Sequence, residues 1–267
     1  MAKRGGAEFV CGVHAVLAAL GRGPERARRL LIASGRKGLP AERARAMAEE
    51  AGIPVEDAPQ AALDEVSGTR QHQGLAAEVR PTPVLGLGAF LEAQPIEKPP
   101  ILLLDGVQDP RNLGAILRTA AALGAGGAVW PKDSAVDLTP TVAKAAAGAI
   151  ETLPLARVTN MARSVLAVKK AGYWAIAGDP EGEADLASAP LPRPAALVLG
   201  GEGRGLRRLV RKNCDIGVRI PLIGGIVNSL NVSVAAGILL YELVAQRSGT
   251  EADPSRREAE KPDLAKA

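Results

Sequence analysis

The sequence predicts an α/β protein: a mainly parallel sheet with helices on both faces, preceded by a smaller α/β unit. The second half of the chain repeats one design, in which an apolar strand leads into a loop of Gly and polar residues and then into a helix. The design occurs in residues 102–125, 197–210 and 217–246. Because the loops after parallel strands meet at the carboxyl edge of a sheet, where open α/β sheets bind ligands, we expect the three loops to share one site.

A proline-rich segment separates the two units. Residues 81–100 contain five prolines, and such segments resist packing and act as semi-rigid spacers. We place the boundary near residue 96 and predict a first domain over residues 1–80, a linker over 81–100 and a second domain over 101–247. Residues 248–267 are rich in charge and poor in apolar side chains, which indicates a disordered tail.

Composition limits the class of protein. The chain has 267 residues, and its 47% of hydrophobic side chains is enough for substantial cores. Its apolar runs are too short for a membrane span, and the start, MAKRGGAEFV, lacks the apolar stretch of a secretion signal. We therefore expect a cytoplasmic protein without a membrane partner. Cys11 and Cys214 fit no C-x-x-C pattern and only two histidines are present, so we expect neither a disulfide nor a metal centre.

Basic residues concentrate at the front of the chain. Residues 1–45 contain ten Lys and Arg against three Asp and Glu, whereas residues 46–100 contain three against nine. The net charge of +4 and the pI near 9.2 permit a nucleic-acid partner. The basic cluster is what an RNA-docking face requires, and a solvated charged surface is the alternative.

The first domain alternates helical and strand patterns, as in a small α/β unit with its own core. We expect helices over residues 10–20 and 40–51, and strands over residues 29–34 and 75–79. His14 falls in an apolar helical stretch, which favours a core or capping histidine over a catalytic one.

A polar loop precedes the last of these strands. Its side chains carry planar hydrogen-bonding groups that could contact RNA: Arg70, Gln71, His72 and Gln73. A turn stabilised by its own side chains is the competing interpretation.

The second domain reads as alternating strands and helices, which implies a mainly parallel, doubly wound sheet. Strands are expected near residues 101–105, 127–130, 152–156, 173–178, 195–199 and 217–222. Helices are expected near residues 110–123, 140–149, 159–171, 205–212 and 229–246.

The first of the three loops ends in a strong helix start, Asp109 followed by Pro110. Asn112 therefore falls in the first helical turn, and Arg118 nearly two turns further along. Arg111 and Arg118 share a helix face whose other residues are small, which lets a partner approach. The competing interpretations are a solvated charge at Arg111 and a salt bridge at Arg118.

Glu202 dominates the second loop. The sequence GGEGRG follows a strand, but its spacing is not G-x-G-x-x-G, and a carboxylate opposes a pyrophosphate. A carboxylate suits a cationic ligand such as a sulfonium. Glu202 could equally orient Arg or Asn side chains of the other loops, or cap a helix.

The third loop contains Asn228, Ser229 and Asn231. These are poor residues inside a helix but good ligands for the free N–H groups at its start. We expect them at the mouth of the last long helix, and we place the chemistry there. A helix cap without further function is the alternative.

Together the three stretches resemble the SpoU/TrmH branch of the SPOUT RNA 2'-O-methyltransferases. The residues that carry the resemblance lie in DPRNLGAILRTA, LGGEGRGL and IPLIGGIVNSLNVSVA: Asn112, Arg118, Glu202, Ser229 and Asn231. The resemblance implies a SPOUT domain with a deep trefoil knot, in which the segment after Leu199 threads a preceding loop. It also implies S-adenosylmethionine (AdoMet) as methyl donor, and a homodimer with its active site near the subunit interface.

The resemblance also implies roles for individual residues. Arg118 would activate the ribose 2'-hydroxyl, Asn112 would position Arg118 or the substrate, and Ser229 and Asn231 would complete the active site. Since arginine stays protonated, we favour stabilisation of the alkoxide or a grip on the adjacent phosphate over proton abstraction by Arg118. Backbone groups of four residues would hold the adenosyl moiety: Gly200, Ile220, Leu222 and Leu230.

The first domain indicates the substrate. Its GVHAV and TRQHQG segments resemble the substrate-binding domain, similar to a small ribosomal protein, of the ribosomal RNA enzymes of this branch. The resemblance implies 23S rRNA as partner and methylation of a guanosine in its peptidyl-transferase P-loop. The alternatives are a tRNA or another ribosomal target, and a non-catalytic RNA-binding or ribosome-assembly factor.

Overall fold

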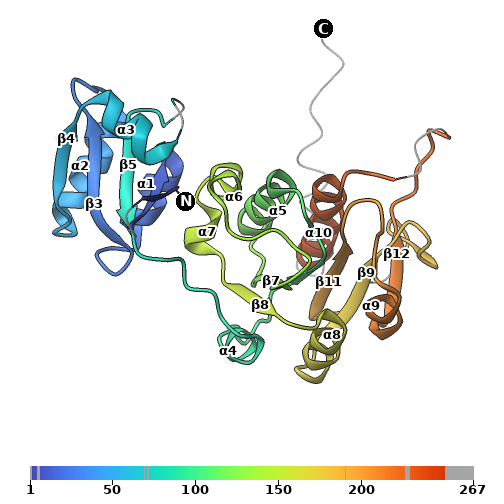
Figure 1. Ribbon diagram of the computed structural model, residues 1–267. Helices are drawn as coiled ribbons and strands as arrows, with labels where there is room; N and C mark the ends of the chain where they lie inside the picture. The colour runs from blue at the N-terminus through green and yellow to red at the C-terminus, as the bar shows by residue number, and fades with distance from the viewer. Residues whose placement is uncertain are drawn as a thin grey trace, which may run out of the picture.

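The computed structural model of the chain has two domains, each built around one sheet (Figure 1). The structure describes residues 2–4, 7–68, 70, 72–189, 191–225 and 229–249. The expected tail, apart from its first two residues, and Asn228 lie outside these ranges. No helix in the described ranges is long and apolar enough to cross a membrane.

The sheet of the first domain has the strand order β1-β2-β5-β3-β4. Its strands are β1 (Ala2–Arg4), β2 (Ala7–Cys11), β3 (Ala27–Ala33), β4 (Val55–Ala58) and β5 (Leu75–Val79). Strand β5 is antiparallel to both β2 and β3, and β4 is parallel to β3. Side chains alternate along β3, so Leu30 packs under α1 (Val13–Gly21) and α2 (Leu39–Glu50), whereas Leu31 packs under α3 (Gln60–Ser67).

The first expected helix, residues 10–20, is wrong at its start. Val10 and Cys11 belong to β2, which pairs with β5, and the chain turns at Gly12 with φ 92° before α1 begins. The apolar run crosses from strand to helix without a polar break, which is why its periodicity did not reveal the boundary. The neighbouring predictions at residues 29–34, 40–51 and 75–79 agree with β3, α2 and β5.

The sheet of the second domain is parallel at every pair of its described strands, with the order β10-β12-β9-β11-β6-β7-β8. Its strands are β6 (Ile101–Asp105), β7 (Gly127–Pro131), β8 (Leu155–Val158), β9 (Trp174–Gly178), β10 (Ala184–Asp185), β11 (Ala195–Gly200) and β12 (Ile216–Arg219). All are within a few residues of the expected positions except β10, which the sequence did not suggest. The doubly wound sheet is therefore confirmed.

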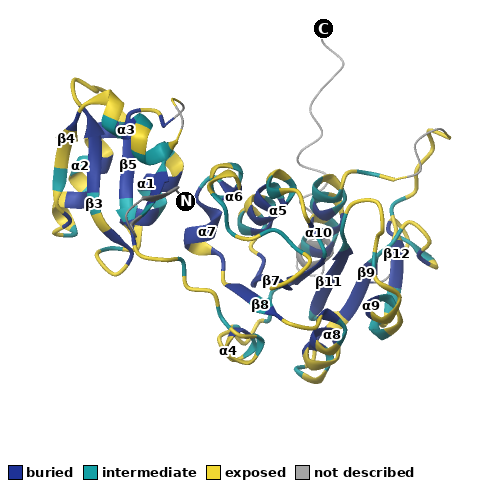
Figure 2. Cartoon of the chain, in the orientation of Figure 1, coloured by how far each residue is buried: buried dark blue, intermediate teal, exposed yellow. Residues whose placement is uncertain are grey.

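Helices cover both faces of this sheet (Figure 1). On one face Leu102 and Leu104 of β6 pack with α5 (Pro110–Ala122), α6 (Pro140–Ala146), α7 (Ala149–Thr152) and α10 (Val232–Gly249). On the other face Ile101 and Leu103 pack with α4 (Leu87–Glu92), α8 (Met161–Lys170) and α9 (Arg208–Asn213). Figure 2 shows the resulting buried strands between exposed helix surfaces.

The expected helix over residues 140–149 is divided into α6 and α7. Ala147 and Gly148 both have positive φ, 48° and 95°, and end the first helix. Gly148 also lies against the first domain: a Cβ built there would be 3.0 Å from the Cβ of Ala18 and 3.1 Å from the backbone oxygen of His14, both in α1. A side chain at position 148 would therefore push the two domains apart.

Part of the proline-rich segment packs on the second domain, which differs from the expected spacer. Leu85 pairs with β8 by donating its N–H to the oxygen of Leu155 at 2.8 Å. Phe90 in α4 is completely buried in the core beneath β6. A single aromatic side chain with apolar neighbours thus anchors a segment whose prolines suggested a free linker.

Candidate active site

A cavity of about 430 Å³ opens at the carboxyl edge of the second sheet, where the loops after β9, β11 and β12 meet. Its walls combine apolar side chains with a few polar groups, as small-molecule sites usually do. Its lining includes Asp179, Gly200, Gly201, Glu202, Ile220, Leu222, Ser229, Leu230 and Asn231. The loops after β11 and β12 were expected at this edge, and both contribute.

The three predicted loops are joined by a chain of hydrogen bonds at the border of this cavity. The Asn231 side-chain amide donates to Oδ1 of Asn112 at 3.0 Å, and Nδ2 of Asn112 donates to Oε1 of Glu202 at 2.7 Å. The backbone N–H of Gln108 donates to the other oxygen of Glu202 at 3.3 Å. The network fixes the direction of both amides, and it holds the Glu202 carboxylate beside the cavity.

Asn231 also caps helix α10, which begins at the next residue, Val232. Its Oδ1 accepts the N–H of Ser233 at 2.9 Å and the hydroxyl of the same residue, which is the geometry of a helix cap. The cap and the active-site contact therefore come from the same side chain. Glu202, by contrast, lies six residues before Arg208, where α9 begins, so it caps no helix. The expected helix start at residue 205 is wrong by three residues.

Asp105 and Arg207 hold the second loop in place, and sequence reasoning missed both. The side chain of Asp105, at the end of β6, has no solvent exposure. It accepts the backbone N–H of Arg207 at 3.1 Å and the Nε–H of Arg207 at 2.8 Å. The hydrogen bond raises the pKa of the Arg207 guanidinium above its usual value. The available signal was a carboxylate that ends an otherwise apolar strand.

Glycines let the first two loops touch backbone to backbone. A Cβ at Gly201 would lie 2.0 Å from the oxygen of Gly106, and one at Gly200 would lie 2.0 Å from the carbonyl carbon of Gly205. Neither position accepts a side chain without movement of the loop. The contact at Gly201 therefore keeps Glu202 close to the loop that precedes Asn112, and the contact at Gly200 packs the second loop against itself.

A second ion-pair cluster borders the cavity on the side of β9. Arg211 donates to Asp179 at 3.0 Å and also pairs with Glu183, whose Oε1 accepts the N–H of Gly217 at 2.8 Å. Backbone hydrogen bonds, first from Gly217 and then from Glu183 itself, lower the pKa of Glu183, and the charge of Arg211 adds to the effect. The cluster ties the loop after β9 to β12, and no sequence pattern indicated it.

Arg118 does not join the other predicted residues within one chain. It lies on the exposed side of α5, about 9 Å along the helix from Asn112, and borders a different hollow. Its side chain makes no hydrogen bond or ion pair with the part of the chain that the structure describes, which removes the expected alternative of a salt bridge there. Arg111 is similarly exposed.

The two histidines differ from each other. His14 is exposed in the first turn of α1, so of the expected core or capping histidine the core alternative is wrong. His72 is fully buried, accepts the N–H of Gly74 at Nδ1, and places Nε2 3.1 Å from Asp64. The turn-stabilising interpretation therefore holds for His72, whereas Gln71 lies outside the described residues. Within the described ranges no three His, Cys, Asp or Glu side chains gather as a metal site.

Comparison with known proteins gives the class that the sequence resembles, the RNA 2'-O-methyltransferases. Residues 99–241 match the SpoU rRNA Methylase family, and residues 9–85 match a domain described as RNA 2'-O ribose methyltransferase substrate binding. The chain is 44% identical to the 23S rRNA (guanosine-2'-O-)-methyltransferase RlmB of Pseudomonas putida, over 90% of this chain and 97% of that one. The protein of the same name from Photobacterium profundum is 42% identical over 90% and 98%.

Solved structures share the fold. The SpoU methyltransferase AviRb from Streptomyces viridochromogenes, in complex with the cofactor AdoMet, superimposes with a TM-score of 0.75 at 28% identity, over 91% of each chain. The A. aeolicus TrmH/SpoU tRNA modifying enzyme gives 0.52 at 27% identity, over 62% of this chain and 84% of that one.

The parallel sheet, the cavity at its carboxyl edge and the network beside it define a methyltransferase of the SPOUT class. The chain belongs to the SpoU rRNA Methylase family. The expected resemblance is thereby confirmed, and the threading of the knot stays a prediction.

Proposed function

We propose that the protein transfers a methyl group from AdoMet to the ribose 2'-hydroxyl of a guanosine in 23S rRNA. The observation that carries the proposal is the network of Asn231, Asn112 and Glu202 beside a cavity of cofactor size. The names of the relatives with 42–44% identity support the same substrate. The location of the guanosine in the peptidyl-transferase P-loop and the cytoplasmic compartment stay predictions.

The residues that border the cavity fit AdoMet. Ile220 and Leu222 supply apolar contact, and Gly200 and Leu230 border the cavity, where their backbone groups would bind the adenosyl moiety. Glu202 offers a negative charge to a sulfonium, and its orientation is already fixed by Asn112 and Gln108. When bound, AdoMet supplies an electrophilic methyl group on a sulfonium sulfur.

We further propose a homodimer in which Arg118 of the partner subunit completes the site. Helix α10 packs beside α5 and exposes three apolar side chains at helical spacing: Val234, Ile238 and Tyr241, which are 50%, 39% and 62% exposed. Such a stripe on one helix face suits a second copy of the chain. Because Asn231 lies at the start of α10, an interface on this helix lies close to the cavity.

The chain's own groups then divide the work of the reaction. The guanidinium of Arg118 of the partner subunit stabilises the negative charge that develops on the ribose oxygen, since it remains protonated. Asn112, Asn231 and Ser229 hold the substrate in line with the methyl group. The oxygen–carbon bond forms as the sulfur–carbon bond breaks, S-adenosylhomocysteine leaves, and the hydroxyl proton passes to solvent.

The alternatives have less support. The similarity to the A. aeolicus tRNA modifying enzyme covers 62% of this chain, whereas the similarity to the 23S rRNA enzymes extends over 90%. A non-catalytic assembly factor would not need Asn112, Glu202 and Asn231 held in one network.

Labelled AdoMet, incubated with the purified protein and separate rRNA and tRNA pools, tests the proposal after nucleoside mapping. We expect label in 2'-O-methylguanosine from 23S rRNA, and near-total loss of transfer in Arg118→Ala. Label in a base, or only in tRNA, contradicts the substrate. If calorimetry detects no AdoMet binding although the protein is folded, the proposed enzymatic activity is contradicted.

A further inference from the structure

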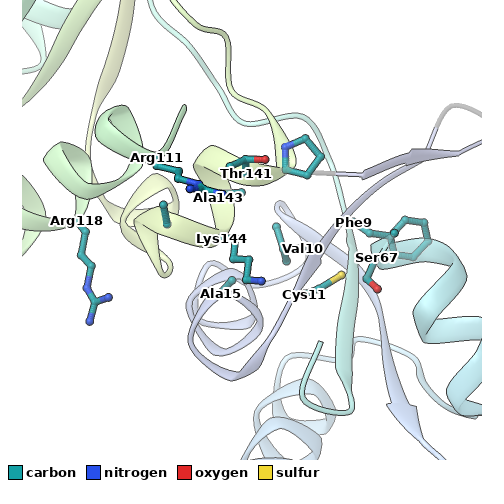
Figure 3. A pocket seen from close by; sticks show the side chains of 13 residues that line it. Phe9, Val10, Cys11, Ala15, Ser67, Arg111, Arg118, Thr141, Ala143 and Lys144 are labelled. Atoms are coloured by element: carbon teal, nitrogen blue, oxygen red, sulfur yellow. The ribbon is translucent and has the colours of Figure 1, made fainter. Parts of the chain in front are cut away.

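Two adjoining hollows lie between the domains, on the side of α5 and α6 that faces the first domain (Figure 3). Their volumes are about 600 Å³ and about 540 Å³. They adjoin each other, since both have Cys11, Ala15 and Lys144 in their walls, and we call the two together the interdomain groove. Both domains therefore contribute to a single surface.

The groove is strongly basic. Its cationic side chains come from both domains: Arg70 before β5, Lys144 in α6, and Arg111 and Arg118 in α5. None of the described residues that line it is Asp or Glu. Arg70, Arg111 and Arg118 are exposed and form no ion pair within the described part of the chain. Like charges repel when gathered in this way, which favours a polyanion as occupant.

The walls favour recognition of phosphates over recognition of bases. Thr141 adds a hydroxyl group, which is a good phosphate ligand. Two aromatic rings belong to the described lining: that of Phe9 is 4% exposed and lies in the core around Leu31, so it offers no face on which a base could stack, which leaves the exposed imidazole of His14 as the one ring that a base could reach. Figure 3 shows the side chains of Lys144 and Arg118 extending in the same direction from their helices.

We propose that the interdomain groove binds the phosphodiester backbone of the RNA strand next to the modified nucleotide. Arg70, Lys144 and Arg111 hold successive phosphates, and the strand leaves the groove at Arg118. This inference rests on the proposed function, because it takes the RNA substrate as the occupant. It adds that the two domains grip the RNA together, independently of its base sequence.

The groove exists before RNA arrives, because a buried ion pair fixes its walls. Arg26 of the first domain and Glu151 of α7 form this pair, and their side chains are 5% and 4% exposed. A preformed site loses less conformational entropy on binding than two freely moving domains would.

The test uses the double variant Arg70→Gln/Lys144→Gln in the full-length protein. The probe is a 23S rRNA fragment that contains the guanosine identified by nucleoside mapping. The affinity of the protein for this fragment is measured over a range of salt concentrations. Loss of two phosphate contacts lowers the slope of log affinity against log salt by about 1.4 for a single strand. We expect RNA affinity to fall about tenfold or more at low salt, KM for RNA to rise, and kcat and AdoMet affinity to stay the same.

A matched control removes one exposed charge from each domain outside the groove, in Arg43→Gln/Lys170→Gln. Its salt slope should equal that of the unmodified protein. AdoMet binding by calorimetry shows that each variant is folded; the single variant Lys144→Gln, with a slope lower by about 0.7, replaces the double variant if that protein does not fold.

If the groove variant has the same salt slope as the unmodified protein, the groove does not bind the RNA phosphates. An equal fall of the salt slope in the control variant contradicts the proposal in the same way. The proposed function survives that result if the unmodified protein still methylates the fragment. Conversely, if the unmodified protein shows the expected difference in salt slope from the groove variant and yet transfers no methyl group, the proposed reaction is rejected. That result still supports the groove as an RNA-binding site.

Discussion

Arg26 and Glu151 form a bidentate ion pair across the boundary between the domains, although they are 125 positions apart in the sequence. Nε of Arg26 lies 2.5 Å from Oε2 of Glu151, and Nη2 lies 2.7 Å from Oε1. The same Nη2 donates to the hydroxyl of Thr82 at 3.1 Å. A single side chain thus joins both domains and the segment between them.

Glu151→Ala should therefore destabilise the contact between the domains strongly. Removal of one partner leaves the other charge buried without compensation, and the expected loss in free energy of unfolding is about 3–5 kcal/mol. Urea denaturation measures it. Arg26→Leu/Glu151→Leu removes both charges and should regain most of the loss, and a double variant as unstable as the single one would show that the charge is not the cause.

Asp105→Asn should weaken AdoMet binding without unfolding the protein. The change removes the charge that holds Arg207, so the loop with Glu202 loses its fixed position. We expect the dissociation constant to rise about tenfold, the scale of one charge-assisted hydrogen bond. Calorimetry measures the affinity, and Arg208→Gln, an exposed neighbour of Arg207, serves as control. An unchanged affinity in Asp105→Asn would mean that Arg207 is not needed to place the loop.

Mixed dimers should regain activity that neither parent has. Arg118→Ala and Glu202→Ala should each be inactive alone. If Arg118 acts in the partner's site, random mixing makes half of the dimers hybrid, each with one complete site, and about a quarter of the original activity returns. Unfolding and refolding of the mixture, followed by a methyl-transfer assay, measures this. If no activity returns although hybrids form, Arg118 does not act across the interface.

Acid should weaken the link between β12 and the loop after β9. The native contacts of Glu183 lower its pKa below the ordinary value of 4.5, so they stabilise the fold above that pH, and the stabilisation disappears as the pH falls through the lowered pKa. Glu183→Gln keeps an acceptor for the N–H of Gly217 but has no charge to lose. The stability difference between the two proteins in urea should shrink below pH 4.5, and a constant difference contradicts the assignment.

The sequence predicted most of the second domain, and its failures have physical reasons. The strand–loop–helix repeat placed β6, β11 and β12 and brought Asn112, Glu202 and Asn231 together, because parallel strands leave their loops at one edge. Asp105 was missed because its partner lies 102 residues away, and local pattern contains no such distance.

The first domain was harder to predict. Gly12 separates a strand from a helix inside one apolar run, and only the pairing of β2 with β5 decides between them. Helix α4 was missed for a similar reason: Phe90 packs against strands that follow it in the sequence, and the surrounding prolines suggested an open spacer.

The anchoring of Leu85 and Phe90 leaves a very short tether between the domains. The stretch that is free of both sheets, residues 81–84, reaches at most about 14 Å when fully extended. If Arg26 and Glu151 separate, the first domain therefore stays close to the second. The effective concentration of one domain near the other is then on the order of millimolar or above. Reclosure is then an intramolecular event, so the two domains return to the same contact after any opening and the groove keeps its preformed walls.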